Sequence, residues 1–147
     1  IMVALEEPTS GHDTNLEAAL EHAAQRLNRR GFVILISDPL APVEQFEAGL
    51  KLLRGCGHDV VVFQVLDPVE LNLAVDGPRL FEDVETGRKL YADPRDASVE
   101  FIRQVTEHND AVQAVCEKLG AAFIRTVTDQ PLELVLSEFL HARRSRR

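Results

Sequence analysis

Asp38, Asp67 and Asp129 each follow an apolar run of a kind that predicts a strand buried on both faces of a parallel sheet. The carboxyl ends of parallel strands meet at one edge, which is where open α/β sheets bind ligands. Three carboxylates at that edge would form an acidic rim suited to Mg²⁺, because this cation prefers oxygen ligands. Thr14, which precedes the first of these runs, would add a hydroxyl oxygen to the same edge.

The same four residues also have a structural interpretation, because aspartate and threonine side chains cap the first turn of a helix. Asp67 and Asp129 each have a proline one or two residues later, and for these two we favour capping. Thr14 opens a capping-box pattern that ends at Glu17, which alone would account for it. Asp38 precedes two prolines and is a poorer cap, so both interpretations stay open for it.

The composition predicts a globular domain and excludes several classes of function. With 147 residues and 45% hydrophobic residues, the chain is long enough for one packed domain. A net charge of −8 argues against a nucleic-acid interface, and no apolar run is long enough for a membrane helix. Phosphate-binding glycine motifs and nucleophile–base motifs are absent. Two widely spaced cysteines favour a reducing, cytoplasmic location with buried thiols.

The order of the apolar patterns predicts a three-layer α/β fold with a mainly parallel sheet and helices on both faces. We expect a single domain over residues 1–147, a hairpin insertion over 76–92 and a basic, disordered tail over 142–147. The pattern predicts helices from 14 to 28, 43 to 55, 94 to 119 and 131 onward, and strands over Phe32–Ser37, Asp59–Leu66 and Ala121–Val127.

Five segments of the chain carry a family resemblance, namely Gly11–Leu20, Arg29–Asp38, Gly55–Pro68, Asp83–Gly87 and Thr126–Leu132. Together they resemble the second half of a von Willebrand factor type A domain, and more narrowly the bacterial family called domain of unknown function 58. The resemblance covers nearly the whole chain, and the combination of segments is more specific than any one of them.

The resemblance implies a metal-ion-dependent adhesion site of which this chain holds only part. In type A domains such a site combines an Asp-x-Ser-x-Ser loop, a threonine and an aspartate, and Thr14 and Asp38 would be the last two. The loop should precede Thr14 and is absent, so we expect a fragment of a longer protein that lacks the first strands of its domain. We expect no cofactor to bind this chain alone, and Mg²⁺ to bind only the full-length protein.

The missing strand would pair with the apolar run that precedes Asp38. Its absence would leave a long apolar edge, which is a template for pairing with another chain. We therefore predict a homodimer formed through this edge, made of Phe32, Val33, Ile34, Leu35 and Ile36.

The leading hypothesis is a non-enzymatic, cytoplasmic protein-interaction domain that binds a partner through a cation in the full-length protein. The family resemblance implies work beside a MoxR-type AAA+ ATPase, and some relatives carry membrane helices upstream. Two alternatives stay open. One is a Mg²⁺-dependent, phosphatase-like enzyme using Asp38, Asp67 and Asp129, although no Asp-x-Asp follows any strand. The other is a structural module without metal.

Overall fold

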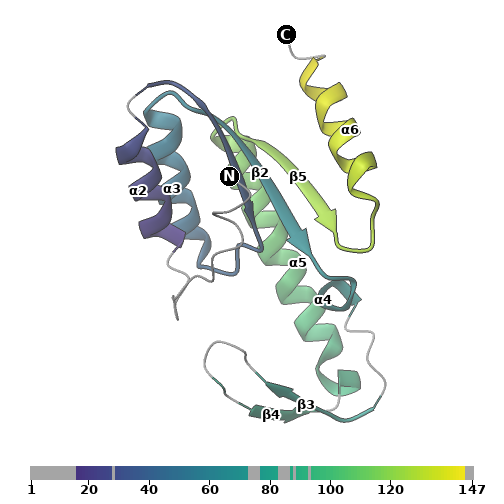
Figure 1. Ribbon diagram of the computed structural model, residues 1–147. Helices are drawn as coiled ribbons and strands as arrows, with labels where there is room; N and C mark the ends of the chain where they lie inside the picture. Colours follow the sequence, from purple (N-terminus) through teal and green to yellow (C-terminus); the bar gives the residue numbers. More distant parts are fainter. Residues whose placement is uncertain are drawn as a thin grey trace.

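The computed structural model describes residues 16–27, 29–72, 77–82, 87, 89–92 and 94–144 of the chain (Figure 1). Its elements follow the alternating order that the apolar patterns predict. They are α2 (Leu16–Arg26), β1 (Phe32–Ser37), α3 (Val43–Gly55), β2 (Asp59–Leu66), α4 (Pro68–Asn72), β3 (Arg79–Glu82), β4 (Lys89–Ala92), α5 (Pro94–Lys118), β5 (Ala122–Val127) and α6 (Leu132–Arg144).

Three parallel strands form the main sheet in the order β1-β2-β5, so β2 is the central strand. In the register, Val61 of β2 lies between Ile34 of β1 and Ala122 of β5. Because all three strands run the same way, their carboxyl ends lie at one edge of the sheet (Figure 1). This confirms the α/β fold class and the parallel sheet.

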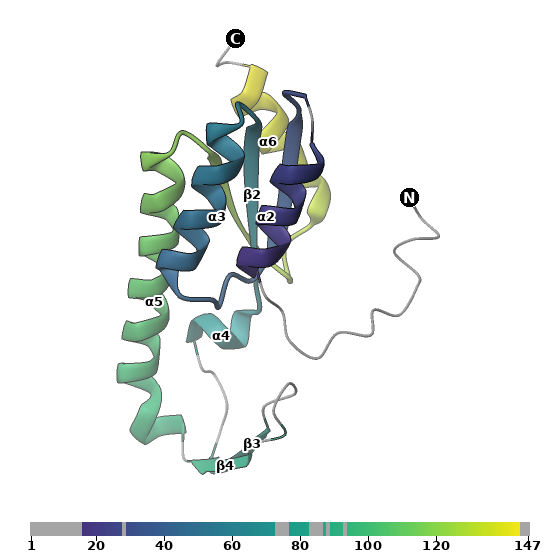
Figure 2. The ribbon, with the colours of Figure 1, turned by 90° about the vertical axis from the view of Figure 1, so that its left-hand side faces the viewer.

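The larger hydrophobic core lies between one face of the sheet and the helices α2, α3 and α5 (Figure 2). Phe46, Leu50 and Leu53 of α3 are fully buried, as their spacing along one helical face predicts. They pack with residues from β2, α2 and α5, including Val60, Val62, Leu20, Val112 and Cys116.

A smaller core on the opposite face is covered by α6. Val135 and Phe139 of α6 pack against Val61, Phe63 and Ile124. The rings of Phe63 and Phe139 meet edge to face with their centroids 5.5 Å apart. The sheet therefore carries helices on both faces, and the predicted three layers are confirmed.

The prediction that β1 is buried on both faces is wrong. Phe32, Ile34 and Ile36 are 45%, 50% and 69% exposed, whereas Val33 and Leu35 on the other face pack against the larger core. The reason is the place of β1 at the edge of the sheet, where α6 covers β2 and β5 instead. Near the end of α6, the Arg143 guanidinium lies 3.9 Å from the centroid of the Phe32 ring.

The face of α6 is also less buried than its spacing predicts. Val135 is buried and Phe139 is partly buried, but Leu132, Leu136 and Leu140 remain 59%, 40% and 61% exposed. A narrow sheet of three strands offers too little surface to cover the whole apolar side of this helix. Apolar side chains of β1 and α6 are thus exposed in the described structure.

The predicted hairpin and the long helix after it are present. Strands β3 and β4 pair antiparallel, with Glu82 opposite Lys89, and α5 begins at Pro94 as expected. Residues 76, 83–86 and 88 of the predicted insertion lie outside the described residues. The helix α6 extends through Arg144, so part of the tail predicted as disordered from residue 142 is helical.

A polar network joins the centre of the sheet to α5. Gln64 of β2 is 1% exposed, and its side-chain amide donates a hydrogen bond to Asn109 Oδ1 at 2.7 Å. Arg125 of β5 donates from Nε to Gln64 Oε1 at 3.2 Å, and its Nη2 atom lies 3.7 Å from Asp110 Oδ1. Burial of an amide is tolerated here because its hydrogen-bonding groups are paired.

Only one of the two cysteines fits the expectation of buried thiols. Burial raises the pKa of the Cys116 thiol to about 12, which keeps it protonated and unreactive at neutral pH. Cys56, which follows the last residue of α3, is exposed, so the prediction is wrong for it.

Candidate functional site

A hollow of about 410 Å³ lies at the carboxyl ends of the parallel strands. All three strands contribute to its lining, directly or through the residue that follows them, and α4 contributes Glu70. We call it the carboxyl-end hollow, lined by Ile36, Ser37, Asp38, Val65, Leu66, Asp67, Glu70 and Thr128.

Asp67 caps α4, as its sequence context favours. Its Oδ1 atom accepts a hydrogen bond from the Val69 N–H at 2.8 Å. In return, Glu70 Oε2 accepts from the Asp67 N–H at 2.9 Å, which completes a reciprocal capping box. The second oxygen, Oδ2, accepts a 3.4 Å hydrogen bond from the Thr128 hydroxyl and links β2 to the end of β5. Both oxygens of Asp67 are therefore engaged by the protein.

Asp38 differs from Asp67, because its side chain has no hydrogen bond or ion pair with the described part of the chain. It is exposed at the end of β1, and its backbone carbonyl accepts from the Leu40 N–H at 2.6 Å. The helix α3 begins five residues later at Val43, after Pro42 as the N-cap. Asp38 therefore does not cap α3. Its carboxylate has no partner in the described part of the chain, so its interpretation as a ligand-binding residue stays open.

The remaining predicted site residues are placed differently. Asp129 is exposed and does not line the carboxyl-end hollow. Its side chain makes no hydrogen bond to α6 within the described residues, so the favoured capping interpretation is not borne out for it. Thr14 lies outside the described residues. The structure therefore brings together two of the three predicted aspartates.

The carboxyl-end hollow is negatively charged. Asp38, Asp67 and Glu70 all line it, and none of them is in an ion pair with another described residue. Such a concentration of one sign of charge attracts cations or basic groups. Across the described ranges, however, no three His, Cys, Asp or Glu side chains are close enough to hold a metal ion.

Three polar residues of the hollow were missed by the sequence analysis, namely Ser37, Glu70 and Thr128. Glu70 carried a local signal, since it stands three residues after Asp67 in a capping-box spacing. Ser37 and Thr128 lie at strand ends, where only the sheet order shows that they face the same hollow.

A comparison with protein families and curated proteins finds several matches. The family model described as "Protein of unknown function DUF58" matches residues 1–114. Uncharacterized proteins of Mycobacterium tuberculosis and Mycobacterium bovis are each 27% identical over 149 residues, covering 97% of this chain. An uncharacterized protein of Mycobacterium avium is 28% identical over 133 residues, covering 88% of this chain and 76% of that protein.

The chain spans 45% of the length of the tuberculosis and bovis relatives. No solved structure matches it. Among the described helices, none combines the length and apolarity needed to cross a membrane.

Proposed function

The chain belongs to the family described as Protein of unknown function DUF58, and we propose that it is part of a non-enzymatic protein-interaction domain. The partner would be recognised at the carboxyl-end hollow. The observation that carries this proposal is the convergence of Asp38 and Asp67 with polar residues from all three strand ends in one open, acidic hollow.

The free carboxylate of Asp38 is the group best placed to bind a ligand. Asp67 already uses one oxygen to cap α4 and the other to hold Thr128, so it shapes the hollow more than it offers a ligand. Val65, Leu66 and Ile36 provide apolar surface beside the carboxylates. This combination suits a protein partner that presents both apolar and cationic contacts, or a carboxylate bridged by a cation.

The described residues do not complete a magnesium site. Mg²⁺ takes six oxygen ligands in near-octahedral geometry, and of the three carboxylates that line the hollow Asp38 alone has both oxygens uncommitted within the described residues. A cation would therefore need Thr14 and further oxygen ligands from outside the described residues. In this proposal, the full-length protein binds the cation, and its binding to the partner depends on that cation.

The resemblance to the family supports a MoxR-type AAA+ ATPase as the partner, in a cytoplasmic setting. This part of the proposal rests on the family alone, since the shape and charge of the hollow do not identify a particular partner. Among the described residues of the hollow, the hydroxyl bonded to a carboxylate is that of Thr128, 3.4 Å from Asp67 Oδ2, and this carboxylate is already held as the cap of α4, which favours binding over catalysis.

Calorimetric titration with Mg²⁺ and Mn²⁺ tests the proposal. We would titrate the 147-residue chain and a version extended upstream by its natural sequence. The expected result is binding by the extended version alone, with loss of binding on Asp38→Ala. Asp129→Ala is the matched control, because Asp129 comes after another strand of the same sheet but does not line the hollow.

Two outcomes would contradict this proposal. Equally tight binding by the 147-residue chain would favour an acidic site complete in itself, and phosphoester turnover would then be measured. If neither version binds a cation, the metal-dependent mechanism is wrong and a metal-free scaffold remains.

A further inference from the structure

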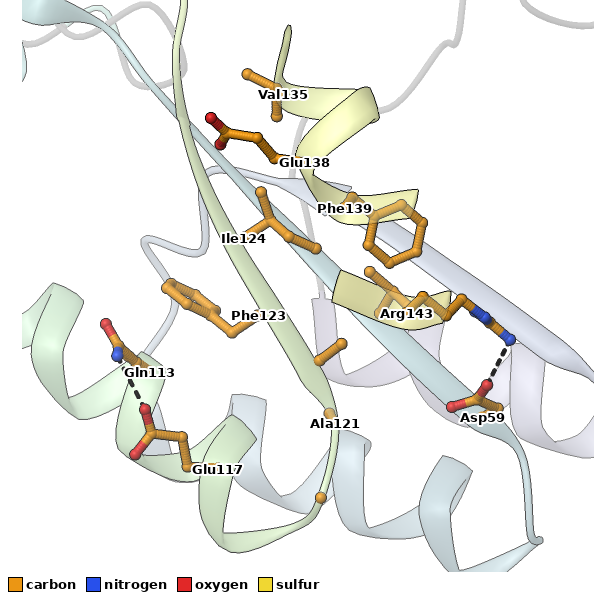
Figure 3. A pocket seen from close by; sticks show the side chains of 13 residues that line it. Asp59, Gln113, Glu117, Ala121, Phe123, Ile124, Val135, Glu138, Phe139 and Arg143 are labelled. Carbon is orange, nitrogen blue, oxygen red and sulfur yellow. Dashed lines mark hydrogen bonds and ion pairs between the residues drawn. The ribbon is translucent and has the colours of Figure 1, made fainter. Parts of the chain in front are cut away.

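A second depression of about 570 Å³ runs along β5, between α5 and α6 (Figure 3). It lies toward the amino end of β5, beside Ala122, Phe123 and Ile124, whereas the carboxyl-end hollow lies beyond the other end of this strand. We call it the β5 groove. The β5 groove is open to solvent, and it has no lining residue in common with the carboxyl-end hollow.

The backbone of β5 presents unpaired groups toward this groove. Thr128 N–H donates to the Leu66 carbonyl at 3.0 Å, which sets the alternation of backbone groups along β5. Because alternate residues of a parallel strand point to opposite neighbours, the N–H and C=O groups of Phe123 and Arg125 face away from β2. The next such residue, Val127, confirms this alternation, since its N–H donates to the Gln130 side chain and not to β2. No other described strand pairs with β5 on that side.

Apolar side chains lie on both sides of the free edge. Phe123 points toward α5, and Ile124 points toward Val135 and Phe139 of α6 (Figure 3). An added strand would alternate its side chains between these two sides. Each side would then offer an apolar contact to one half of the added side chains.

The groove also carries a carboxylate on each side. Glu117 of α5 and Glu138 of α6 are exposed and line it. Glu117 accepts a 2.9 Å hydrogen bond from the neutral Gln113 amide, and neither glutamate is in an ion pair with another described residue. A third carboxylate, Asp59, is neutralised by Arg143 at 2.7 Å. Two negative charges therefore remain available to an occupant.

We propose that the β5 groove binds an extended, basic and apolar peptide segment of a partner protein, which adds to β5 as a fourth strand. Strand addition uses the free backbone groups for affinity and the alternating side chains for specificity. Lysine or arginine side chains of the segment would reach Glu117 and Glu138. Pairing of β5 with a second copy of β5 is disfavoured, because it would bring like charges together.

The test uses a fluorescent nine-residue peptide that repeats two valines followed by two lysines, so that each side of the added strand carries both residue types. Its binding to the 147-residue chain is measured by anisotropy in the presence of a metal chelator. The matched peptide has glutamate in place of lysine. We expect the lysine peptide to bind and the glutamate peptide not to bind. The chelator separates this result from the proposed function, because strand addition needs no cation.

Charge reversal in the groove is the second arm. The variant Glu117→Lys/Glu138→Lys should weaken binding about tenfold, since two exposed attractions become repulsions. The control Glu21→Lys/Glu44→Lys makes the same change in net charge on exposed positions of α2 and α3, and should change binding less than about twofold.

Hydrogen exchange locates the peptide. The amides of Phe123 and Arg125 should become protected when it binds, and a peptide methylated on alternate backbone nitrogens should lose affinity. Equal binding of the glutamate peptide, equal effects of the two double variants, or protection at Phe32–Ile36 instead of β5 would each overturn the proposal, as would failure of the lysine peptide to bind.

Discussion

At the scale of single residues, Asp38 and Asp67 show how position after a strand leaves two roles open. Asp67 became a cap because Val69 and Glu70 follow it at capping spacing and complete a reciprocal pair. Asp38 kept a free carboxylate because the two prolines after it delay the start of α3 to Val43. The spacing to the next helix therefore separates the structural aspartate from the one available for a ligand.

The stability of the folded chain should depend on pH through the carboxyl group of Glu47. Hydrogen bonds from Lys118 and then Lys51, both at 2.8 Å, lower the pKa of its carboxyl group to about 2 from an ordinary value of 4.5. Since the folded-state pKa is lowered, this stabilisation is present above about pH 4.5 and is lost as the pH falls toward 2.

We therefore expect Glu47→Gln to lower the urea midpoint at pH 7 and to have a smaller effect near pH 2.5. Glu44→Gln on the same helix is the control, because Glu44 is exposed and in no ion pair with another described residue. The measurement is urea unfolding followed by circular dichroism at several pH values. A constant difference between wild type and Glu47→Gln across this range would contradict the prediction.

At the scale of elements, close contact between α2 and α3 depends on a glycine. Gly49 is buried on α3, and a Cβ atom added there would lie 2.5 Å from Leu20 Cδ1 and 2.8 Å from Leu20 Cβ. These distances are too short for ordinary contact, so α2 would have to move. The absence of a side chain at Gly49 is therefore what lets Leu20 approach α3.

We expect Gly49→Ala to destabilise the chain by about 1–3 kcal/mol, as overpacking of a core does. The matched control is Gly55→Ala at the end of the same helix, where an added Cβ meets nothing within 4 Å. That variant should be neutral or more stable by up to about 1 kcal/mol, because alanine favours the helix. Thermal unfolding of both variants measures the difference, and equal melting temperatures would show that Leu20 moves aside without cost.

At the scale of the whole molecule, the described sheet has two free edges of different character. The edge at β1 has exposed apolar side chains, whereas the edge at β5 is lined by glutamates. Exposed apolar strand edges promote pairing between chains, and charges oppose it. The homodimer predicted through Phe32–Ile36 is consistent with this asymmetry and stays a prediction.

Sedimentation velocity at several concentrations tests the dimer. We expect the 147-residue chain to self-associate and Ile34→Lys/Ile36→Lys to be monomeric, because two charges on the exposed side of β1 oppose pairing. Leu132→Lys/Leu134→Lys is the control, since it replaces leucines that are 59% and 61% exposed on α6. A monomeric wild type, or equal loss of association in both variants, would exclude the β1 interface.

Local patterns in the sequence predicted the helices and strands except the short helix α4, which was not among the predicted helices. The helical spacing of Phe46, Leu50 and Leu53, the proline at the start of α5 and the glycine between the hairpin strands each predict structure within about one turn or one strand. The family was recognisable from the combination of such segments, and the match over residues 1–114 confirms it.

The packing of the elements against one another sets which surfaces are covered and which side chains meet. An apolar run such as Phe32–Ser37 can form either a central strand or an edge strand. The exposure of its side chains therefore depends on the order of strands in the sheet. The pairing of Gln64 with Asn109, and the meeting of Asp38, Asp67 and Thr128, join residues far apart in the chain. Local propensity contains no information on such partners, since they are set by packing between elements.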